Sequence, residues 1–233
     1  MRPPAAIALA LAGSLLAARA IAQTQDDGGL WLATLAQGRL AAAESSLGDF
    51  RWWLEAQARW RNEGEDLDMA FFRPALGYAL STQATAFVGY GLFDIDPAGA
   101  PSHLEHRVWE QLSLNLPIEG FALSSRTRLE QRFVEDESET GDRLRQQFKA
   151  MVPLSESKAT YVSIFDEGFF DLNDTDWGQR AGFRQNRAFL GLGIYLDDAH
   201  KNAIEVGYLN QWIDKTTEDG MNHILSISLF LNF

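Results

Sequence analysis

Apolar and polar residues alternate along this chain from residue 49 to the C-terminus, with a period of two. This is the pattern of β-strands, whose successive side chains point to opposite faces. In the segment 126–133, for example, Leu129 and Phe133 alternate with Arg128, Glu130 and Arg132. Segments of this kind predict ten strands, at 49–60, 71–80, 84–93, 105–116, 126–133, 143–152, 159–167, 185–196, 203–213 and 223–233.

The expected fold is an all-β, transmembrane antiparallel β-barrel of about ten strands, within a range of 10–12. The segment 30–41 (LWLATLAQGRLA) also has the character of a strand and would be an eleventh, or part of a twelve-strand barrel. We favour ten, because bacterial outer-membrane barrels have even strand numbers. A soluble β-sandwich or a lipocalin-like barrel is the alternative, since it would show the same alternation.

Three features favour the membrane barrel over the soluble alternatives. The predicted strands are roughly 10–13 residues long, which is long for a soluble sheet and sufficient to cross a bilayer when tilted. Their polar faces are crowded with Arg and Glu, which suits a lumen of paired charges better than a solvated surface. Short connections alternate with longer, acidic or polar ones such as VEDESETGD (134–142), as periplasmic turns and external loops do.

The first 22 residues have the pattern of a cleaved secretory signal peptide. Arg2 precedes a short apolar run, and small residues offer cleavage sites near Ala20 and Ala22. The expected organisation is therefore a signal peptide at 1–22, an N-terminal segment with a possible extra strand at 23–48, and the barrel at 49–233. Together with the barrel pattern, this predicts a location in the bacterial outer membrane.

The overall charge restricts the possible partners. The chain has 32 acidic and 20 basic residues, so nucleic acid is not an expected partner. It has no cysteine, which excludes disulfides and thiolate metal sites. No cofactor is expected. Outer-membrane lipid and lipopolysaccharide are the expected surroundings, with divalent ions bridging lipopolysaccharide to the acidic loops.

The polar faces of the strands predict a charged lumen. The residues expected there, which we call the lumen charge set, are Glu55, Arg59, Arg73, Glu105, Arg107, Arg126, Arg128, Glu130, Arg132, Arg143, Arg145, Glu167 and Arg187. In the hairpin between 126 and 152, the expected register places Glu130 opposite Arg145 and Arg132 opposite Arg143. These charges either fill a narrow barrel or line a small pore or binding cavity that favours anions. The function is then structural, or a narrow conduit or binding cavity for a small solute.

An outer-membrane enzyme acting on lipid A or phospholipid is the alternative function. Such an enzyme needs a histidine with a serine or carboxylate partner. The candidates are His103 and His106 beside Glu105, and His223 with Ser226 three residues on; His200 is the fourth histidine. The histidine spacing indicates no metal site, and no catalytic residue is assigned.

The last strand ends on an aromatic residue, with Ile227, Leu229, Leu231 and Phe233 on its apolar face. This arrangement resembles the C-terminal signal by which the barrel-assembly machinery recognises outer-membrane substrates. That machinery is therefore an expected partner during biogenesis.

Several motifs together resemble one bacterial family. In order they are EHRVWEQL, RTRLEQRF, RLRQQ, DEGFFDLND, GFRQNRAFLGLG, EVGYLNQW and NHILSISLFLNF, and the resemblance extends over about residues 30–233. The family is domain of unknown function 2490. The resemblance implies an outer-membrane β-barrel, with no agreed activity and no catalytic residues to carry over.

Overall fold

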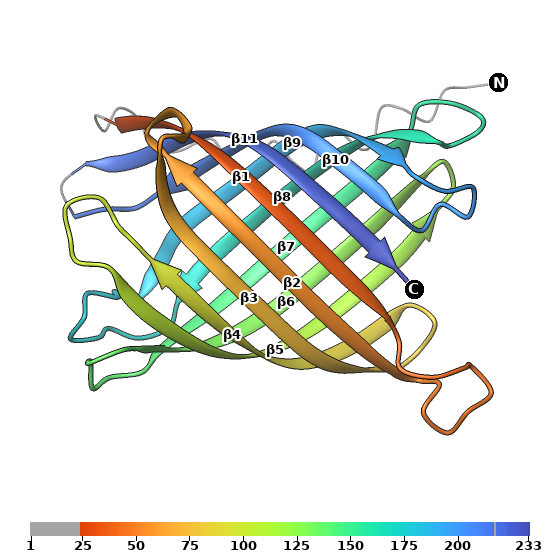
Figure 1. Cartoon of the computed structure of the whole chain (residues 1–233), viewed down its shortest axis with the longest axis horizontal. Coiled ribbons are helices and arrows are strands. Elements are labelled where there is room, and N and C mark those ends of the chain that lie inside the picture. The colour runs from red at the N-terminus through yellow and green to blue at the C-terminus, as the bar shows by residue number, and fades with distance from the viewer. Residues whose placement is uncertain (1–23, 217) are drawn as a thin grey trace.

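The computed structural model describes residues 24–216 and 218–233, which form eleven β-strands and one short 3₁₀ turn (Figure 1). The expected signal peptide lies outside these residues. The strands are β1 (Thr24–Arg39), β2 (Phe50–Arg61), β3 (Asp66–Ala79), β4 (Ala84–Ile95), β5 (His103–Ile118), β6 (Phe121–Val134), β7 (Gly141–Pro153), β8 (Thr160–Asp171), β9 (Gly182–Tyr195), β10 (Ala203–Ile213) and β11 (Asp219–Asn232), with the 3₁₀ turn η1 at Asn62–Gly64. No helix in this part of the chain is long and apolar enough to cross a membrane.

The strands close into one barrel, with β1 hydrogen-bonded between β2 and β11. The preferred number of ten strands is therefore wrong, and the possible extra strand in 23–48 is part of the barrel. Neighbouring strands are antiparallel except β1 and β11, which are parallel from Thr24 opposite Asp219 to Gln37 opposite Asn232. The reason is topological: β2 and β11 run in opposite directions, so a strand inserted between them must be parallel to one of them.

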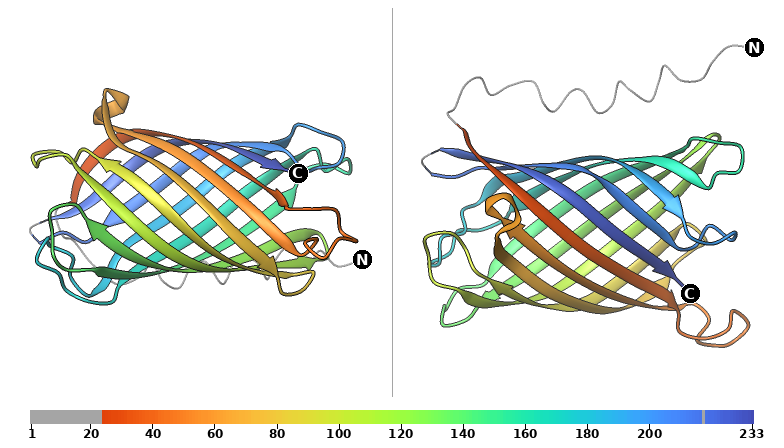
Figure 2. Two further views of the ribbon diagram at one scale, coloured as in Figure 1. Left: turned by 60° about the horizontal axis from the view of Figure 1, so that its bottom comes forward. Right: turned by 45° about the horizontal axis from the view of Figure 1, so that its top comes forward.

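Each end of the barrel has five connections, as the two views in Figure 2 show, and the expected alternation of short and long connections is not observed, because the two longest, 40–49 and 172–181, lie at opposite ends. The C-terminus shares one end with the connections 40–49, 80–83, 119–120, 154–159 and 196–202, and we call this the C-terminal end. The other end, which we call the β1-start end, carries the connections 62–65, 96–102, 135–140 and 172–181, together with the one between β10 and β11. Because β1 is parallel to β11, Thr24 and Phe233 lie at opposite ends.

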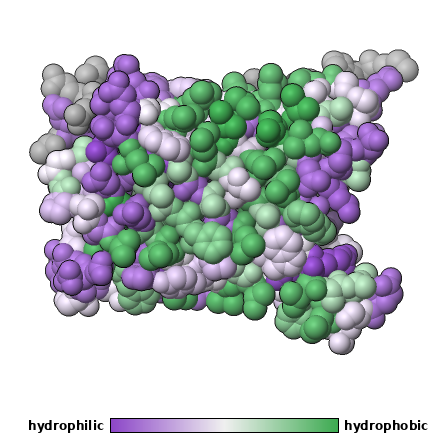
Figure 3. Space-filling model, viewed as in Figure 1, coloured by the Kyte–Doolittle hydropathy of each residue, from purple (hydrophilic) through white to green (hydrophobic). Residues whose placement is uncertain are grey.

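Polarity is inverted relative to a soluble barrel. Along β6, Arg128 and Glu130 have no exposed surface and point into the lumen, whereas Phe133 is 42% exposed on the outside. Leu76 and Leu190 on other strands are 56% and 57% exposed. In the space-filling view, hydrophobic side chains gather over the middle of the barrel wall and hydrophilic ones at its two ends (Figure 3).

Large aromatic rings fit into the lumen because glycines lie opposite them. Gly89 pairs with Trp109 across β4 and β5, and a Cβ atom on Gly89 would lie 2.4 Å from the Trp109 ring. Gly193 pairs with Tyr161, where the same distance would be 2.1 Å. These glycines let the rings lie flat against the neighbouring strand, as in other aromatic–glycine pairs of β-sheets.

Candidate functional site in the barrel interior

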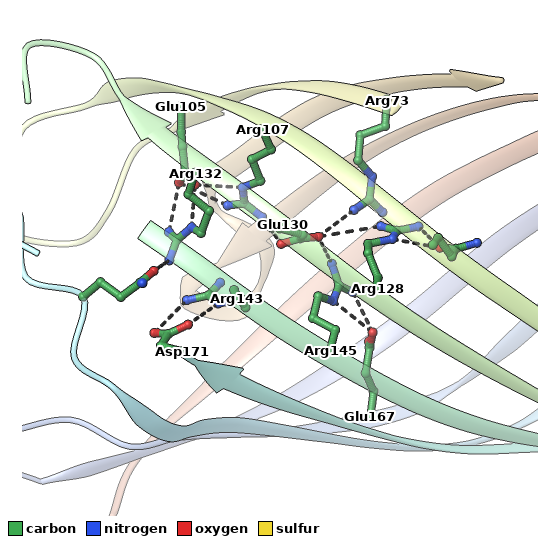
Figure 4. A network of polar contacts seen from close by, with 12 residues as sticks. Arg73, Glu105, Arg107, Arg128, Glu130, Arg132, Arg143, Arg145, Glu167 and Asp171 are labelled. Atoms are coloured by element: carbon green, nitrogen blue, oxygen red, sulfur yellow. Dashed lines mark hydrogen bonds and ion pairs between the residues drawn. The ribbon is translucent and has the colours of Figure 1, made fainter. Parts of the chain in front are cut away.

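A buried carboxylate on β6 lies at the centre of the lumen. Glu130 Oε1 accepts a hydrogen bond from Arg145 Nη1 at 2.7 Å and lies 3.5 Å from Arg73 Nη1 and 3.8 Å from Arg128 Nη1. Its other oxygen is 3.4 Å from Arg107 Nη1. Four guanidinium groups from β3, β5, β6 and β7 therefore surround one carboxylate that has no exposed surface (Figure 4).

A second carboxylate extends this network toward the β1-start end. Glu105, also without exposed surface, accepts two hydrogen bonds from Arg107 at 2.8 and 3.1 Å and two from Arg132 at 2.6 and 3.0 Å. Arg132 also donates to Gln179 in the connection 172–181 at 2.9 Å. Bidentate pairs of this type fix both partners in one geometry. Because the fixed Arg132 side chain also donates to Gln179, it holds the connection 172–181 against the barrel interior.

The network continues toward the C-terminal end through a third carboxylate. Glu167 on β8 accepts hydrogen bonds from Arg126 and Arg145, both at 2.8 Å. Arg187 on β9 lies 4.0 Å away. Glu55 on β2 pairs with Arg73 at 2.6 Å. Charges from seven strands thus form one connected set of ion pairs.

The structure places every member of the lumen charge set on the inward faces of the strands. The expected register of the hairpin is wrong: Glu130 lies opposite Arg143, Arg128 opposite Arg145, and Arg132 opposite Gly141. A shift of two residues keeps every side chain on its face, so alternation alone could not detect it. The observed register places Gly141, which has no side chain, where Gln179 and Trp177 pack; a Cβ atom there would lie 2.6 Å from each.

A polar cluster near the C-terminal end was not predicted. Glu205 on β10 is 3% exposed and accepts hydrogen bonds from Lys149 at 2.7 Å, Tyr161 at 3.0 Å and Ser163 at 3.1 Å. Glu205 could have been predicted to face the lumen from the segment AIEVGYL (203–209), where Glu205 and Leu209 alternate with apolar residues that point outward. Asp171, which pairs with Arg143 at 2.6 Å, is a second residue missed in this way.

Aromatic rings cover the faces of several lumen arginines, and these were also missed. Arg107 lies 3.8 Å from the ring centre of Phe93, and Arg128 lies 4.3 Å from that of Trp109. Cation–π contacts of this kind stabilise a guanidinium that has little access to water.

Between this network and the C-terminal end lies a cavity of about 510 Å³. Three acidic side chains line it, Glu55, Glu167 and Glu205. Eight cationic side chains line it, Arg39, Arg51, Arg59, Arg73, Arg126, Arg145, Lys149 and Arg187. Two buried apolar clusters contribute to its walls, one containing Trp31, Phe189 and Leu209 and the other containing Trp53 and Phe87.

The inner end of the cavity is closed by the ion-pair network. Arg128, Glu130 and Trp109 have no exposed surface, so water does not reach these side chains from either end. At the β1-start end, the connection 172–181 adds Gln179, which is only 4% exposed. The lumen is therefore open toward the C-terminal end and filled by side chains in its inner part.

Two of the histidines expected to serve an enzyme, His106 and His223, lie on the outer surface, whereas His103 begins β5 in the same inward phase as Glu105. His223 Nδ1 is 2.6 Å from the Tyr208 hydroxyl on the outer surface, and His106 pairs with Tyr90 in the same way. Ser226 is buried on the lumen side of β11, so His223 and Ser226 lie on opposite faces of the barrel wall. Among the described residues, no group of three or more His, Asp or Glu side chains is arranged to hold a metal ion.

The expected assembly-signal residues end the last strand. Ile227, Leu229 and Leu231 belong to β11, and the Phe233 amide donates to Gln37 O at 2.9 Å. Phe233 is 71% exposed, with its ring 5.7 Å from that of Trp52.

Comparison with known proteins identifies the family. Residues 28–222 match the family described as protein of unknown function (DUF2490), and the chain belongs to it. It is 34% identical over 220 residues to an uncharacterized protein of Methylorubrum extorquens, covering 93% of this chain and 92% of that protein. No solved structure matches the chain.

Proposed function

We propose that this protein is an integral β-barrel of the bacterial outer membrane, with a closed interior and a cavity for a small anionic solute at one end. The observation that carries the proposal is the inverted polarity of the wall. Val88, Leu76 and Leu190 are each at least 56% exposed, while Glu130 and Arg128 have no exposed surface. Soluble proteins rarely expose continuous apolar surface on this scale, whereas lipid would cover it.

Strand length supports the membrane placement. The shortest strand, β10, has 11 residues and the longest, β1 and β5, have 16. A tilted strand needs about 9–11 residues to cross the hydrocarbon core. The strands therefore have the required length, with additional residues that extend beyond the lipid.

Aromatic pairs near the two barrel ends also support this placement. At the C-terminal end, Phe50 packs against Tyr78 with ring centres 5.3 Å apart. At the β1-start end, Phe183 packs against Phe170 at 5.0 Å and against Trp212 at 5.5 Å. Two girdles of aromatic residues are typical of barrels that span an outer membrane.

The filled interior favours a structural role or one-sided binding over an open conduit. A channel would have to pass Arg128 and Glu130, which no water reaches and which are held by several ion pairs. In the usual orientation of outer-membrane barrels the C-terminal end faces the periplasm, so the cavity would open there. Outer-membrane lipid, lipopolysaccharide at the acidic loops, and the barrel-assembly machinery remain the partners of this proposal.

Two measurements test the proposal. Expression in a diderm bacterium followed by gradient fractionation should place the protein in the outer membrane, with a folded form that migrates differently before and after boiling. Recovery in the soluble periplasmic fraction would contradict membrane insertion. Purified protein in planar lipid bilayers should give no sustained ion conductance, and regular channel openings would contradict the closed interior.

A further inference from the structure

The cavity carries an excess of positive charge that its own carboxylates do not neutralise. Eight cationic side chains but only three acidic ones line it, although the whole chain has a net charge of −12. All three carboxylates are already ion-paired, at nitrogen–oxygen distances of 2.6 to 2.8 Å: Glu55 with Arg73, Glu167 with Arg145, and Glu205 with Lys149. Glu130, beyond the cavity wall, also pairs with Arg73 and Arg145. Within the described part of the chain, the lining cations with no carboxylate within 4.0 Å are therefore Arg39 and Arg51 near the C-terminal end and Arg59 deeper in the lumen.

Arg59 is the clearest example of this unbalanced charge. Among the described residues, no carboxylate oxygen lies within 4.0 Å of its guanidinium. Its contacts include a hydrogen bond from Nε to Gln57 Oε1 at 2.6 Å and two aromatic rings, with Arg59 Cζ 3.9 Å from the ring centre of Trp31 and 5.3 Å from that of Phe71. Arg59 is half-buried, so its guanidinium has lost part of its hydration, and an accompanying anion would offset that loss.

A second guanidinium shares the same ring. Arg187 Cζ lies 4.8 Å from the ring centre of Trp31, and its nearest carboxylate, on Glu167, is 4.0 Å away and already bonded to Arg126 and Arg145. Arg187 Nε and Nη2 donate to the Gln185 side-chain oxygen at 2.6 and 2.8 Å, so the N–H donors that remain at this ring are on Nη1 of Arg187 and on Nη1 and Nη2 of Arg59. Arginine forks match the geometry of carboxylate, sulfonate and phosphate groups.

The wall beside these arginines is apolar. Trp31, Phe189 and Leu209 are 6%, 4% and 3% exposed and pack together, with Phe165 stacked on Phe189 at 4.9 Å. Sites for organic ligands combine such walls with a few well-placed polar groups, and a volume of about 510 Å³ is within their usual range.

We propose that the inner part of the cavity binds an organic anion with an apolar, ring-bearing body. Its carboxylate, sulfonate or phosphate group contacts Arg59 and Arg187, and its body lies against the wall formed by Trp31 and Phe189. This rests on the proposed function, of which it names the ligand class. An inorganic anion would leave the apolar wall unused, and a neutral ring would leave Arg59 without a counter-charge.

Calorimetric titration of the purified protein in nonionic detergent micelles tests this site with three probes. They are naphthalene-2-sulfonate, inorganic sulfate, and the neutral 2-naphthalenemethanol. Naphthalene-2-sulfonate should bind more tightly than either of the others. Arg59→Gln should weaken its binding roughly ten- to hundredfold, because a hydrogen bond to a charged group is lost, and Arg59→Lys should fall between.

The matched control is Arg180→Gln, which removes the same charge from the connection 172–181 at the β1-start end, away from the cavity wall. It should bind like the unmodified protein. Arg59→Gln leaves no carboxylate unpaired, so its boiling-dependent mobility should be unchanged. Equal binding by Arg59→Gln, equal affinity for sulfate, or equal affinity for the neutral ring would overturn the proposal. An absence of binding by protein recovered from the outer membrane would overturn this site while leaving the membrane placement intact.

Discussion

Removal of one central charge should reveal how far the buried network stabilises the barrel. Glu130→Gln keeps the side-chain shape but removes the carboxylate that faces four guanidinium groups. At an effective dielectric constant of about 20, one charge pair at ~4 Å is worth about 4 kcal/mol. Desolvation offsets much of this attraction, and breaking a buried pair typically costs about 3–5 kcal/mol.

The arrangement of the other carboxylates places Glu130→Gln at the lower end of that range. Arg73 keeps Glu55, Arg107 keeps Glu105 and Arg145 keeps Glu167 as partners. Within residues 24–216 and 218–233, Arg128 is then the one of the four left without a carboxylate within 4.0 Å. We expect a loss of about 3 kcal/mol in the free energy of unfolding. Urea titration of the protein in lipid vesicles, followed by tryptophan fluorescence in both directions, measures this quantity.

Two further variants separate buried charge from general disruption. Glu110→Gln, on the outer surface with one hydrogen bond from Gln131 at 3.3 Å, should change the free energy of unfolding by less than about 0.5 kcal/mol. Adding Arg128→Met to Glu130→Gln removes the buried guanidinium that has lost its carboxylate partner, and it should recover part of the lost stability. A loss below about 1 kcal/mol for Glu130→Gln, or further destabilisation in the double variant, would refute this reasoning.

Three other substitutions test the fold. Gly89→Ala should lower the free energy of unfolding by about 1–3 kcal/mol in the same titration, because the added Cβ would meet the buried Trp109 ring at 2.4 Å. The chain has no cysteine, so Ala36→Cys with Leu231→Cys should form one oxidised cross-link, visible as a mobility shift without reductant, because these positions are opposite in the parallel pair. Phe233→Ala should reduce the amount of barrel recovered in the outer membrane while leaving the urea midpoint of purified protein nearly unchanged, because Phe233 is 71% exposed.

Two of these substitutions have a matched comparison variant, and the third has an outcome that would contradict it. Gly28→Ala, whose Cβ would lie 3.5 Å from its nearest neighbour, should have an effect within about 0.5 kcal/mol, and an equal loss at both glycines would contradict the packing argument. The cysteine pair Ala36→Cys with Leu229→Cys is two residues out of register and should cross-link less. A Phe233→Ala variant that assembles normally would contradict a role for this residue in recognition.

The sequence allowed the inward and outward faces to be predicted, because alternation with a period of two fixes them. It did not fix the strand number, since β1 contains Gly28, Gly29 and several alanines and its parallel partner lies at the other end of the chain. The predicted register of the β6–β7 hairpin was wrong for a related reason. The local sequence determines which face a side chain occupies, but the pairing of Gly141 with Arg132 depends on Trp177 and Gln179, which belong to the later connection 172–181.

The interior was predictable where charge marked it and unpredictable where aromatic residues did. Arg128 and Glu130 stand out on a polar face. Trp31 and Phe189 occupy inward positions too, but an apolar residue in that phase resembles an ordinary exception until the structure shows the two rings packed together and Arg59 and Arg187 on the Trp31 ring. The cavity could not be predicted from the sequence, because its volume depends on how side chains from many strands pack together, and no local sequence pattern encodes this.

The parallel pair of β1 and β11 also constrains the order in which the barrel can form. Leu30 lies opposite Leu225, so closure joins segments 195 residues apart, whereas the β6–β7 hairpin closes over the six residues 135–140. That separation, about five doublings in loop length, adds only about 3 kcal/mol of closure entropy. Until β11 is in place, one edge of β1 has no strand partner, and the unclosed sheet has two open edges able to pair with other chains. Closure of this single parallel seam is therefore the step that removes both edges from the barrel.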